Sequence, residues 1–313
     1  MRYFSAIQKN ATIGVLAPAF PPDAARLEKG IQYLESMGFN VKRGKSLSAA
    51  HMYFSGSDSL RVKDIETFFA DPEVDMIVCA RGGWGALRIL DQLDYELIGQ
   101  NPKPFVGYSD VTTLQLAFWA KSRVPAFSGP MVAVEMGSGI DPFTERHFWG
   151  QVFNDDPWYE FSFARENVEL WQAGRASGRL IGGCLSMLAH QLGTPFMPDL
   201  TNAILFLEDV GEAPYKIDRY LAQLKQAGIF DRLSALILGE FIDCVDDSTS
   251  RKEVSVEDVL HDYFDNTPYP VLYRFPYGHG MRKFTMPIGV KAELNTEQKV
   301  LKLQNPFDKH LSK

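Results

Sequence analysis

The sequence has few cysteines, and no cysteine or histidine pair stands at a metal-binding spacing. Cys79, Cys184 and Cys244 form no C-x-x-C pattern, and no H-x-x-x-H occurs. Three isolated cysteines argue against a disulfide framework and favour reduced, mostly buried thiols in a cytoplasmic protein. We therefore expect neither a metal ion nor any other cofactor.

The chain also lacks long apolar runs and an excess of basic residues. No window reaches the roughly 18 apolar residues that a membrane span requires. The N-terminal residues lack the apolar core of a signal peptide, and their short apolar run at 13–17 is typical of a first strand. The net charge of −7, without a Lys/Arg cluster, argues against nucleic acid as a partner. We expect a cytoplasmic protein that binds neither membranes nor nucleic acid.

What is present is a regular alternation of strand and helix patterns in the first half. A chain of 313 residues is long for one core, so we expect two domains. Buried-strand patterns at 11–17, 39–41, 74–80, 104–106 and 124–127 alternate with helical patterns at 23–37, 58–70 (with Asp58 as cap) and 111–121. Repeated βα units predict a flavodoxin-like α/β domain, a mostly parallel sheet with flanking helices.

The pattern changes after a helix predicted from Asp141-Pro142 to about Phe153. We place the first domain over residues 1–155, a linker over 156–177 with two short strand-like pieces at 158–163 and 168–171, and the second domain over 178–313. The second domain has helical patterns at 184–192 and 215–227, and strand patterns at 203–207, 236–242, 271–275, 288–294 and 300–303. This order predicts a mixed α/β domain with antiparallel strands.

The turn Gly107-Tyr108-Ser109-Asp110 is the most informative motif. A strand-like run precedes it and a helix-like run follows. A serine at such a turn has its hydroxyl lifted clear of the sheet, near backbone N–H groups that can stabilise an oxyanion. The motif is G-Y-S-D-V rather than G-x-S-x-G, so it departs from the usual α/β-hydrolase elbow. Ser109 is a candidate nucleophile.

A serine nucleophile needs a base, and His279 is the candidate among six histidines. It lies in Pro276-Tyr277-Gly278-His279-Gly280, where flanking glycines leave the imidazole uncrowded. The others have sufficient structural or solvated roles: His51, His147, His190, His261 and His310. From the residues alone, a structural role for His279 stays open.

Glu208 is the candidate acid that orients the base. It ends the apolar strand pattern 203–207, and the carboxyl end of a buried strand is where α/β proteins place site residues. Asp209 and Glu212 compete with it. The same acidic cluster also fits a solvated turn or a helix cap, so the residues alone leave these alternatives open.

Two glycine-containing turns complete the candidates. Arg81-Gly82-Gly83-Trp84-Gly85 follows a predicted strand and can present N–H groups. No P-loop or dinucleotide pattern accompanies it, so an oxyanion loop fits better than a phosphate loop, and a plain turn is the alternative. Gly182-Gly183-Cys184 allows a cysteine nucleophile at a helix start, or simply a small buried residue.

Together these segments resemble the LD-carboxypeptidase family of serine peptidases, which also contains self-immunity proteins against the peptide-nucleotide antibiotic microcin C. The glycine loop, the Y-S-D turn and the E-D-x-x-E segment fall in family order. Further matches, spanning almost the whole chain, are at 17–19, 101–104, 178–185, 215–219 and 278–280.

The resemblance implies a triad of Ser109, Glu208 and His279 between two domains, and usually a homodimer. It also implies oxyanion donors at the backbone N–H of Gly83, or its neighbour Gly82, and of Asp110. A carboxypeptidase must bind a terminal carboxylate, which needs a partner charge. The candidates for substrate binding are Arg81, Trp84, Arg282 and Lys283. The last two belong to a segment that is more basic than the family leads us to expect.

We therefore expect a cytoplasmic serine carboxypeptidase that cleaves an L,D peptide bond. The expected reaction releases D-alanine from murein tetrapeptide in cell-wall recycling, through an acyl-enzyme on Ser109. One alternative is an immunity-type hydrolase of a peptidyl or aminoacyl nucleotide, whose relatives tend to have a less arginine-led glycine loop. Another is a two-lobed small-molecule binding protein without catalysis.

Overall fold

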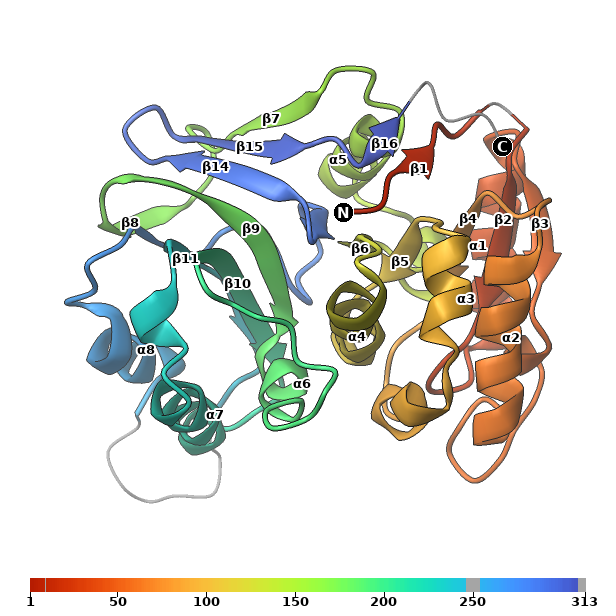
Figure 1. The fold of residues 1–313 in the computed structure, drawn as a ribbon, viewed down its shortest axis with the longest axis horizontal. Helices are drawn as coiled ribbons and strands as arrows, with labels where there is room; N and C mark the ends of the chain where they lie inside the picture. Colours follow the sequence, from red (N-terminus) through yellow and green to blue (C-terminus); the bar gives the residue numbers. More distant parts are fainter. Residues whose placement is uncertain (9, 246–253, 309–313) are drawn as a thin grey trace.

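The computed structural model describes residues 1–8, 10–245 and 254–308, so His310 lies outside the described residues. Two sheets with their helices form two halves that lie side by side (Figure 1). A short parallel pair, β1 (Phe4–Ser5) and β16 (Phe307–Asp308), joins the first strand of the chain to the last described strand. The halves are therefore connected at several points of the chain.

The first half is built around a six-stranded sheet in the order β13-β6-β5-β4-β2-β3. The strands are β2 (Thr12–Leu16), β3 (Asn40–Arg43), β4 (Met76–Cys79), β5 (Phe105–Gly107), β6 (Ala126–Ser128) and β13 (Met286–Ile288). Strands β2 to β6 pair in parallel, as the alternating pattern predicts, and only β13 is antiparallel. The helices are α1 (Ala24–Ser36), α2 (Asp58–Ala70), α3 (Tyr95–Gln100), α4 (Thr112–Ser122) and α5 (Pro142–Val152), with short helical turns at η1 (Lys45–Leu47), η2 (Ala86–Gln92), η3 (Ser109–Val111) and η4 (Val132–Met136).

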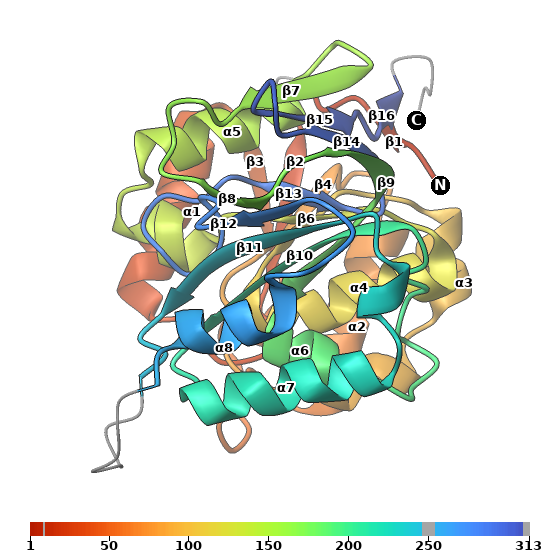
Figure 2. The same ribbon diagram turned by 90° about the vertical axis from the view of Figure 1, so that its left-hand side faces the viewer.

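The second half contains an eight-stranded mixed sheet in the order β7-β15-β14-β9-β10-β11-β12-β8. The strands are β7 (Trp158–Ser162), β8 (Glu169–Gln172), β9 (Arg175–Cys184), β10 (Ala203–Val210), β11 (Ala235–Ile242), β12 (Val271–Tyr273), β14 (Lys291–Asn295) and β15 (Val300–Gln304). The helices are α6 (Leu185–Ala189), α7 (Pro214–Gln226) and α8 (Val256–Phe264), with the turn η5 (Phe230–Arg232). Figure 2 shows these helices together on one side of β10 and β11. The predicted fold class is confirmed: a mostly parallel sheet is joined to a mixed sheet with antiparallel strands.

Two segments differ from their predicted roles. The pattern at 288–294 was expected to form one strand, but the chain breaks at Gly289 into β13, in the first sheet, and β14, in the second. Gly289 has φ +88°, and a Cβ atom there would collide with the Trp119 ring. The two strand-like pieces predicted inside the linker, at 158–163 and 168–171, form β7 and β8, and these belong to the second sheet as its two edges.

Helix α4, which follows Ser109, joins the hydrophobic cores of the two halves. Leu114 and Phe118 pack in the core of the first half, whereas Leu116 and Trp119 pack in the core of the second. One helix with apolar residues on both faces must be covered on both sides. The nucleophile turn is therefore built into the junction between the halves.

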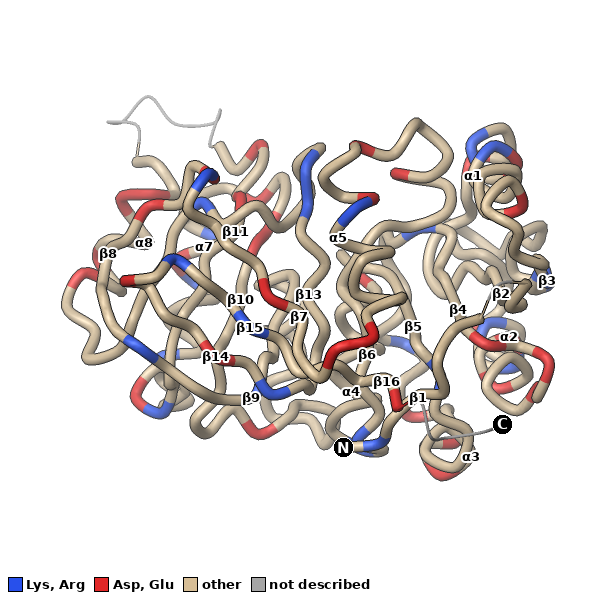
Figure 3. Tube along the Cα trace, turned by 90° about the horizontal axis from the view of Figure 1, so that it is seen from above, with Lys and Arg blue, Asp and Glu red and all other residues tan. Residues whose placement is uncertain are grey.

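The spread of charged residues, the apolarity of the helices and the grouping of possible metal ligands bear on what the molecule could bind. Figure 3 shows acidic and basic residues interspersed over both halves. Within the described ranges, no helix combines the length and apolarity that crossing a membrane needs. In the same ranges, no three His, Cys, Asp or Glu side chains gather in a way that could hold a metal ion.

Candidate active site

Ser109 occupies a strained turn between β5 and α4. Its φ is +65°, in the left-handed region that a residue with a Cβ atom adopts at a cost of about 1 kcal/mol or more. Tyr108 before it is extended, and η3 begins at Ser109 itself. A Cβ atom at Gly82 would lie 3.3 Å from Ser109 Oγ and 3.0 Å from Ser109 Cβ, so the glycine loop passes directly beside the serine. The local geometry is that of a nucleophile turn.

His279 and Glu208 lie 71 residues apart in the sequence and are hydrogen-bonded to each other. His279 Nδ1 lies 2.7 Å from Glu208 Oε2, and the carboxylate is fully buried while the imidazole is 16% exposed. An ionised carboxylate only accepts hydrogen bonds, so Nδ1–H donates and Nε2 is left to take a proton. A Cβ atom at Gly278 (φ +131°) would lie 3.0 Å from Glu208 Oε2, so glycine lets the loop that carries His279 approach the carboxylate.

The His279 ring also reaches the nucleophile turn. It packs edge-to-face on the ring of Tyr108, the residue before Ser109, with 4.9 Å between ring centroids. Among the hydrogen bonds of the described residues, none joins the Ser109 hydroxyl to His279. The structure thus brings Ser109, His279 and Glu208 together. The Ser109 hydroxyl and the His279 imidazole are not hydrogen-bonded to each other, as is common before substrate binds.

The two competing acids have other partners. Asp209 is buried, its Oδ2 accepts the N–H of Ser186 at 2.8 Å, and burial raises its pKa to about 6. Glu212 pairs with Lys216, with 3.1 Å between Oε2 and Nζ. Asp209 therefore holds the start of α6, and Glu208 alone of the three contacts the imidazole.

The glycine loop is shaped so that its N–H groups stay available. Gly83 and Gly85 have φ of +121° and +130°, and a Cβ atom on Gly83 would collide with the Phe20 ring. In the part of the chain that the structure describes, neither Gly82 nor Gly83 donates its N–H to a protein acceptor. The loop can therefore offer these N–H groups to a developing negative charge.

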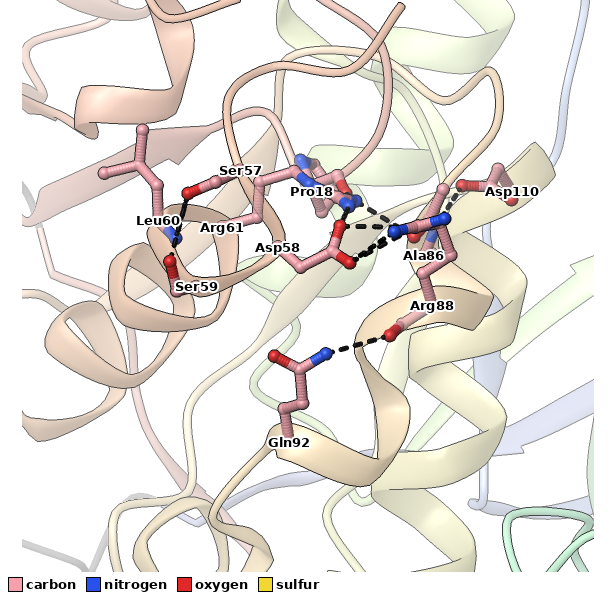
Figure 4. A network of polar contacts seen from close by, with 11 residues as sticks. Pro18, Ser57, Asp58, Ser59, Leu60, Arg61, Ala86, Arg88, Gln92 and Asp110 are labelled. Atoms are coloured by element: carbon pink, nitrogen blue, oxygen red, sulfur yellow. Dashed lines mark hydrogen bonds and ion pairs between the residues drawn. The ribbon is translucent and has the colours of Figure 1, made fainter. Parts of the chain in front are cut away.

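A buried arginine outside the predicted site residues contacts the end of this loop (Figure 4). Arg61 is fully buried, and its Nη1 donates to the carbonyl oxygens of Pro18 (2.6 Å) and Gly85 (2.9 Å). Its Nη2 pairs with Asp58, which Arg88 also contacts at 2.8 Å. Asp58 was predicted to cap α2, but the Ser57 hydroxyl caps the helix by accepting the N–H of Leu60, and the Asp58 carboxylate faces the arginines instead.

The side chain of Asp110 supports the same loop. Its Oδ2 accepts the N–H of Ala86 at 2.8 Å, and Asp110 is 1% exposed (Figure 4). Burial raises its pKa to about 6, although Arg61 acts in the opposite direction. The carboxylate therefore positions the end of the glycine loop, separately from the oxyanion role predicted for the backbone N–H of Asp110.

The four predicted substrate-binding side chains have different surroundings. Arg81 and Trp84 are half-buried, and the Arg81 guanidinium lies 5.7 Å from the centroid of the Phe20 ring. Arg282 is about half exposed and pairs with Glu166 at 3.2 Å. Lys283 is 2% exposed and ion-paired with Glu135. An enclosed ammonium with a carboxylate partner is a poor anchor for a substrate carboxylate, which argues against that prediction for Lys283.

Glu240 lies beside the base and was missed in the sequence. It sits in β11 where two residues oppose one on β10, between the pairs Leu207–Leu238 and Asp209–Phe241. A Cβ atom on Gly280 would collide with Glu240 Oε2, so this carboxylate lies next to the loop of His279. Burial raises the pKa of Glu240, and within the described ranges its carboxylate has no hydrogen bond or ion pair. A bulge in a strand leaves no mark in a single sequence, so no signal pointed to it.

Cys184 lacks the surroundings of a nucleophilic thiol. It is buried, its Sγ lies 3.3 Å from Ser186 Oγ, and burial raises its pKa well above the ordinary value. The serine, imidazole and carboxylate are instead arranged for nucleophilic acyl transfer through an oriented base.

Comparison with known proteins gives two family matches. Residues 13–129 match the model of the LD-carboxypeptidase N-terminal domain, and residues 177–294 match that of the LD-carboxypeptidase C-terminal domain. The chain is 39% identical over 297 residues to a probable murein peptide carboxypeptidase of Bacillus subtilis (strain 168), covering 94% of this chain and 92% of the relative.

Two solved structures share the fold over nearly the whole chain. A muramoyltetrapeptide carboxypeptidase from Oxalobacter formigenes is 30% identical, with a TM-score of 0.82 and coverage of 94% of this chain and 98% of that one. The structure of MccF in complex with glutamyl sulfamoyl guanosine is 26% identical, with a TM-score of 0.89 and full coverage of both chains (100%).

Proposed function

The chain belongs to the LD-carboxypeptidase family and is a serine-type enzyme of that family, and on this premise we propose that it releases the terminal D-alanine of murein tetrapeptide. The observation that carries the mechanism is the 2.7 Å hydrogen bond from His279 to buried Glu208, beside the strained turn of Ser109. We further propose that the enzyme works in the cytoplasm, in cell-wall recycling, and as a homodimer, as the family resemblance implies.

In the proposed reaction, Ser109 Oγ attacks the carbonyl carbon of the L,D peptide bond while His279 Nε2 takes the hydroxyl proton. The N–H groups of Gly82 or Gly83 and of Asp110 stabilise the oxyanion. The C–N bond then breaks, His279 returns the proton to the leaving amine, and D-alanine departs. Water, deprotonated by His279, attacks the ester on Ser109 and releases the shortened peptide, which restores the serine. Glu208 keeps the imidazole in the required tautomer throughout.

The test compares the wild-type enzyme with Ser109→Ala. We expect the substitution to lower kcat on murein tetrapeptide by about 10⁴-fold or more, because the acyl-enzyme cannot form. A fluorophosphonate probe should label the wild-type protein at Ser109 and leave the variant unlabelled. Full activity in Ser109→Ala, without labelling of the wild type, would instead support the binding-protein alternative.

A second candidate function is hydrolysis of a peptidyl or aminoacyl nucleotide, which the likeness to MccF supports. Glu240 favours the murein peptide. Its carboxylate lies beside the His279 loop and pairs with none of the described residues, so it would attract the free ammonium of a diamino acid and repel an acidic acyl group such as the glutamyl group bound to MccF. Parallel assays of murein tetrapeptide and processed microcin C separate the two functions.

Glu240→Gln tests the proposed recognition of the diamino acid. We expect KM for the diamino tetrapeptide to rise about tenfold, which corresponds to about 1.4 kcal/mol. A control tetrapeptide with a neutral side chain at the same position should keep its KM. An equal rise with both peptides would assign Glu240 to the loop structure rather than to the substrate.

A further inference from the structure

Lys283 is a buried cation in the loop that carries His279. It is 2% exposed, and its Nζ forms an ion pair with Glu135 of η4, in the first half of the molecule. The Nζ atom also lies 3.9 Å from the centroid of the Tyr108 ring, and the Lys283 N–H donates to Thr144 Oγ1 at 2.9 Å. A buried ammonium is tolerated because it has a carboxylate and an aromatic face as partners.

Glu135 joins this cation to the nucleophile turn. Its Oε1 accepts the Tyr108 hydroxyl at 2.8 Å as well as the Lys283 ammonium, and its Oε2 accepts the N–H of Met131 at 2.9 Å. The carboxylate is 9% exposed, so water screens these contacts little. Glu135 is therefore held by its own backbone and in turn fixes both Tyr108 and Lys283.

Tyr108 transmits this arrangement to both catalytic candidates. It directly precedes Ser109, and its ring packs on Lys283 and on the imidazole of His279. Between His279 and Lys283 the loop is largely open to solvent, since Met281 is 86% exposed. Lys283 thus forms a buried contact between the loop that carries His279 and the first half of the molecule.

We infer that Glu135 and Lys283 are positioning residues, whose buried ion pair sets how closely His279 approaches Ser109. The inference rests on the proposed function and adds two residues to it. Neither residue touches the reacting atoms, so the pair acts on the turnover step rather than on substrate affinity.

The primary experiment is Lys283→Met, measured as kcat and KM on murein tetrapeptide. We expect kcat to fall about 10²-fold, the cost of displacing a reacting group by about 1 Å, with KM within about threefold of the wild type. The matched control is Lys302→Met, which removes an exposed lysine paired with Glu160 at 2.9 Å on the edge of the second sheet. Its kcat should equal the wild-type value.

A double variant separates positioning from folding. Lys283→Met leaves the Glu135 charge buried without its partner, whereas Glu135→Met combined with Lys283→Met removes both charges. We expect the double variant to regain stability against urea while kcat per folded molecule stays low. The inference is overturned if kcat returns with stability, if Lys283→Met has wild-type kcat, or if only KM changes, which would make Lys283 a substrate anchor.

The outcomes also separate this inference from the proposed function. A wild-type protein that does not cleave the tetrapeptide and is not labelled at Ser109 contradicts the function itself. A wild-type protein that does both, with Lys283→Met equally active, contradicts only the positioning role.

Discussion

The nucleophile side and the base side of the site are held in different ways. Beneath the glycine loop, Arg61 and Asp110 supply buried contacts to carbonyl and N–H groups within the first half. On the other side, His279 depends on one carboxylate of its own half and on Lys283, which is fastened across the junction. The second oxygen of Glu208 is buried without a hydrogen-bond partner in the described part of the chain.

The two kinds of support fit the different parts that the glycine loop and the base have in the reaction. The oxyanion loop must not move as charge develops, so contacts within one half suit it. The base must meet the nucleophile from the other half, so its alignment depends on contacts between the halves. The largest loss of kcat is therefore expected from a substitution on the base side, and substitutions beside the glycine loop should lower kcat less.

The largest effect is expected on the base side, from Glu208→Gln. The amide cannot hold His279 in the required tautomer, so kcat should fall about 10⁴-fold. Glu212→Gln, which alters the neighbouring acid paired with Lys216, is the matched control and should retain wild-type kcat. Steady-state kinetics measure kcat for both variants. If Glu212→Gln loses more activity than Glu208→Gln, Glu212 is the acid that orients His279.

On the nucleophile side, Arg61→Met should lower both the stability of the protein and kcat. It leaves the buried carbonyl of Pro18 without its donor and removes one of the two donors to the Gly85 carbonyl, which keeps the N–H of Arg88, so the free energy of unfolding should fall by about 1–3 kcal/mol. We expect kcat to fall about 10²-fold as the loop loosens. Urea unfolding and kinetics measure both, with Arg88→Met as control. Arg88 is half exposed and pairs with the same Asp58, so its loss should cost less than about 1 kcal/mol.

A smaller, pH-dependent effect is expected from Asp110→Asn. Burial raises the pKa of Asp110 from an ordinary 3.8 to about 6, so the folded protein keeps this proton to a higher pH than the unfolded chain does. The stability contributed by the group is thus complete below about pH 4 and is lost as the pH rises to about 6. Relative to the wild type, Asp110→Asn should gain unfolding free energy over that window and stay level above it.

The backbone N–H of Asp110 survives this substitution, so kcat should change only a few-fold. Urea unfolding at several pH values provides the measurement. A difference between wild type and variant that does not vary with pH would show that Asp110 is not the group that titrates.

The smallest effect is expected from Cys184→Ala. Cys184 lies opposite Glu208 on the neighbouring strand, but its buried thiol contacts Ser186 and Asp209, so kcat should stay within about twofold of the wild type while stability falls by about 1 kcal/mol. Loss of activity in a variant that still folds would support Cys184 as the nucleophile. The reaction would then depend on neither the Ser109 side nor the His279 side of the site.

Much of the fold was accessible from the sequence because it depends on local pattern. The βα alternation predicted the parallel strands β2 to β6, and Asp141-Pro142 marked the start of α5. The break at Gly289 was not predicted, because both flanking segments have strand patterns and only pairing with different sheets separates them. The two strands within 156–177 were recognisable from their local pattern, but that pattern does not say that they form the two edges of one sheet.

The candidate site divides in the same way. Ser109 at its turn, the glycine loop and a carboxylate at the end of a strand were each recognisable, because nucleophiles, N–H donors and acids need particular local conformations. The choice of Glu208 over Asp209, the burial of Lys283 and the place of Glu240 depend on side chains that are far apart in the chain. Local pattern carries no information on which of several acids faces an imidazole 71 residues away in sequence.

The sequence by itself therefore determined the family, the fold class and the set of chemical groups, since these follow from periodicity and from short motifs in a fixed order. Only the tertiary structure decided which groups work together. Burial and approach are properties of packed surfaces: they turned Lys283 from a possible substrate anchor into a partner of Glu135, and they brought Glu208 to His279 at the junction that holds Ser109.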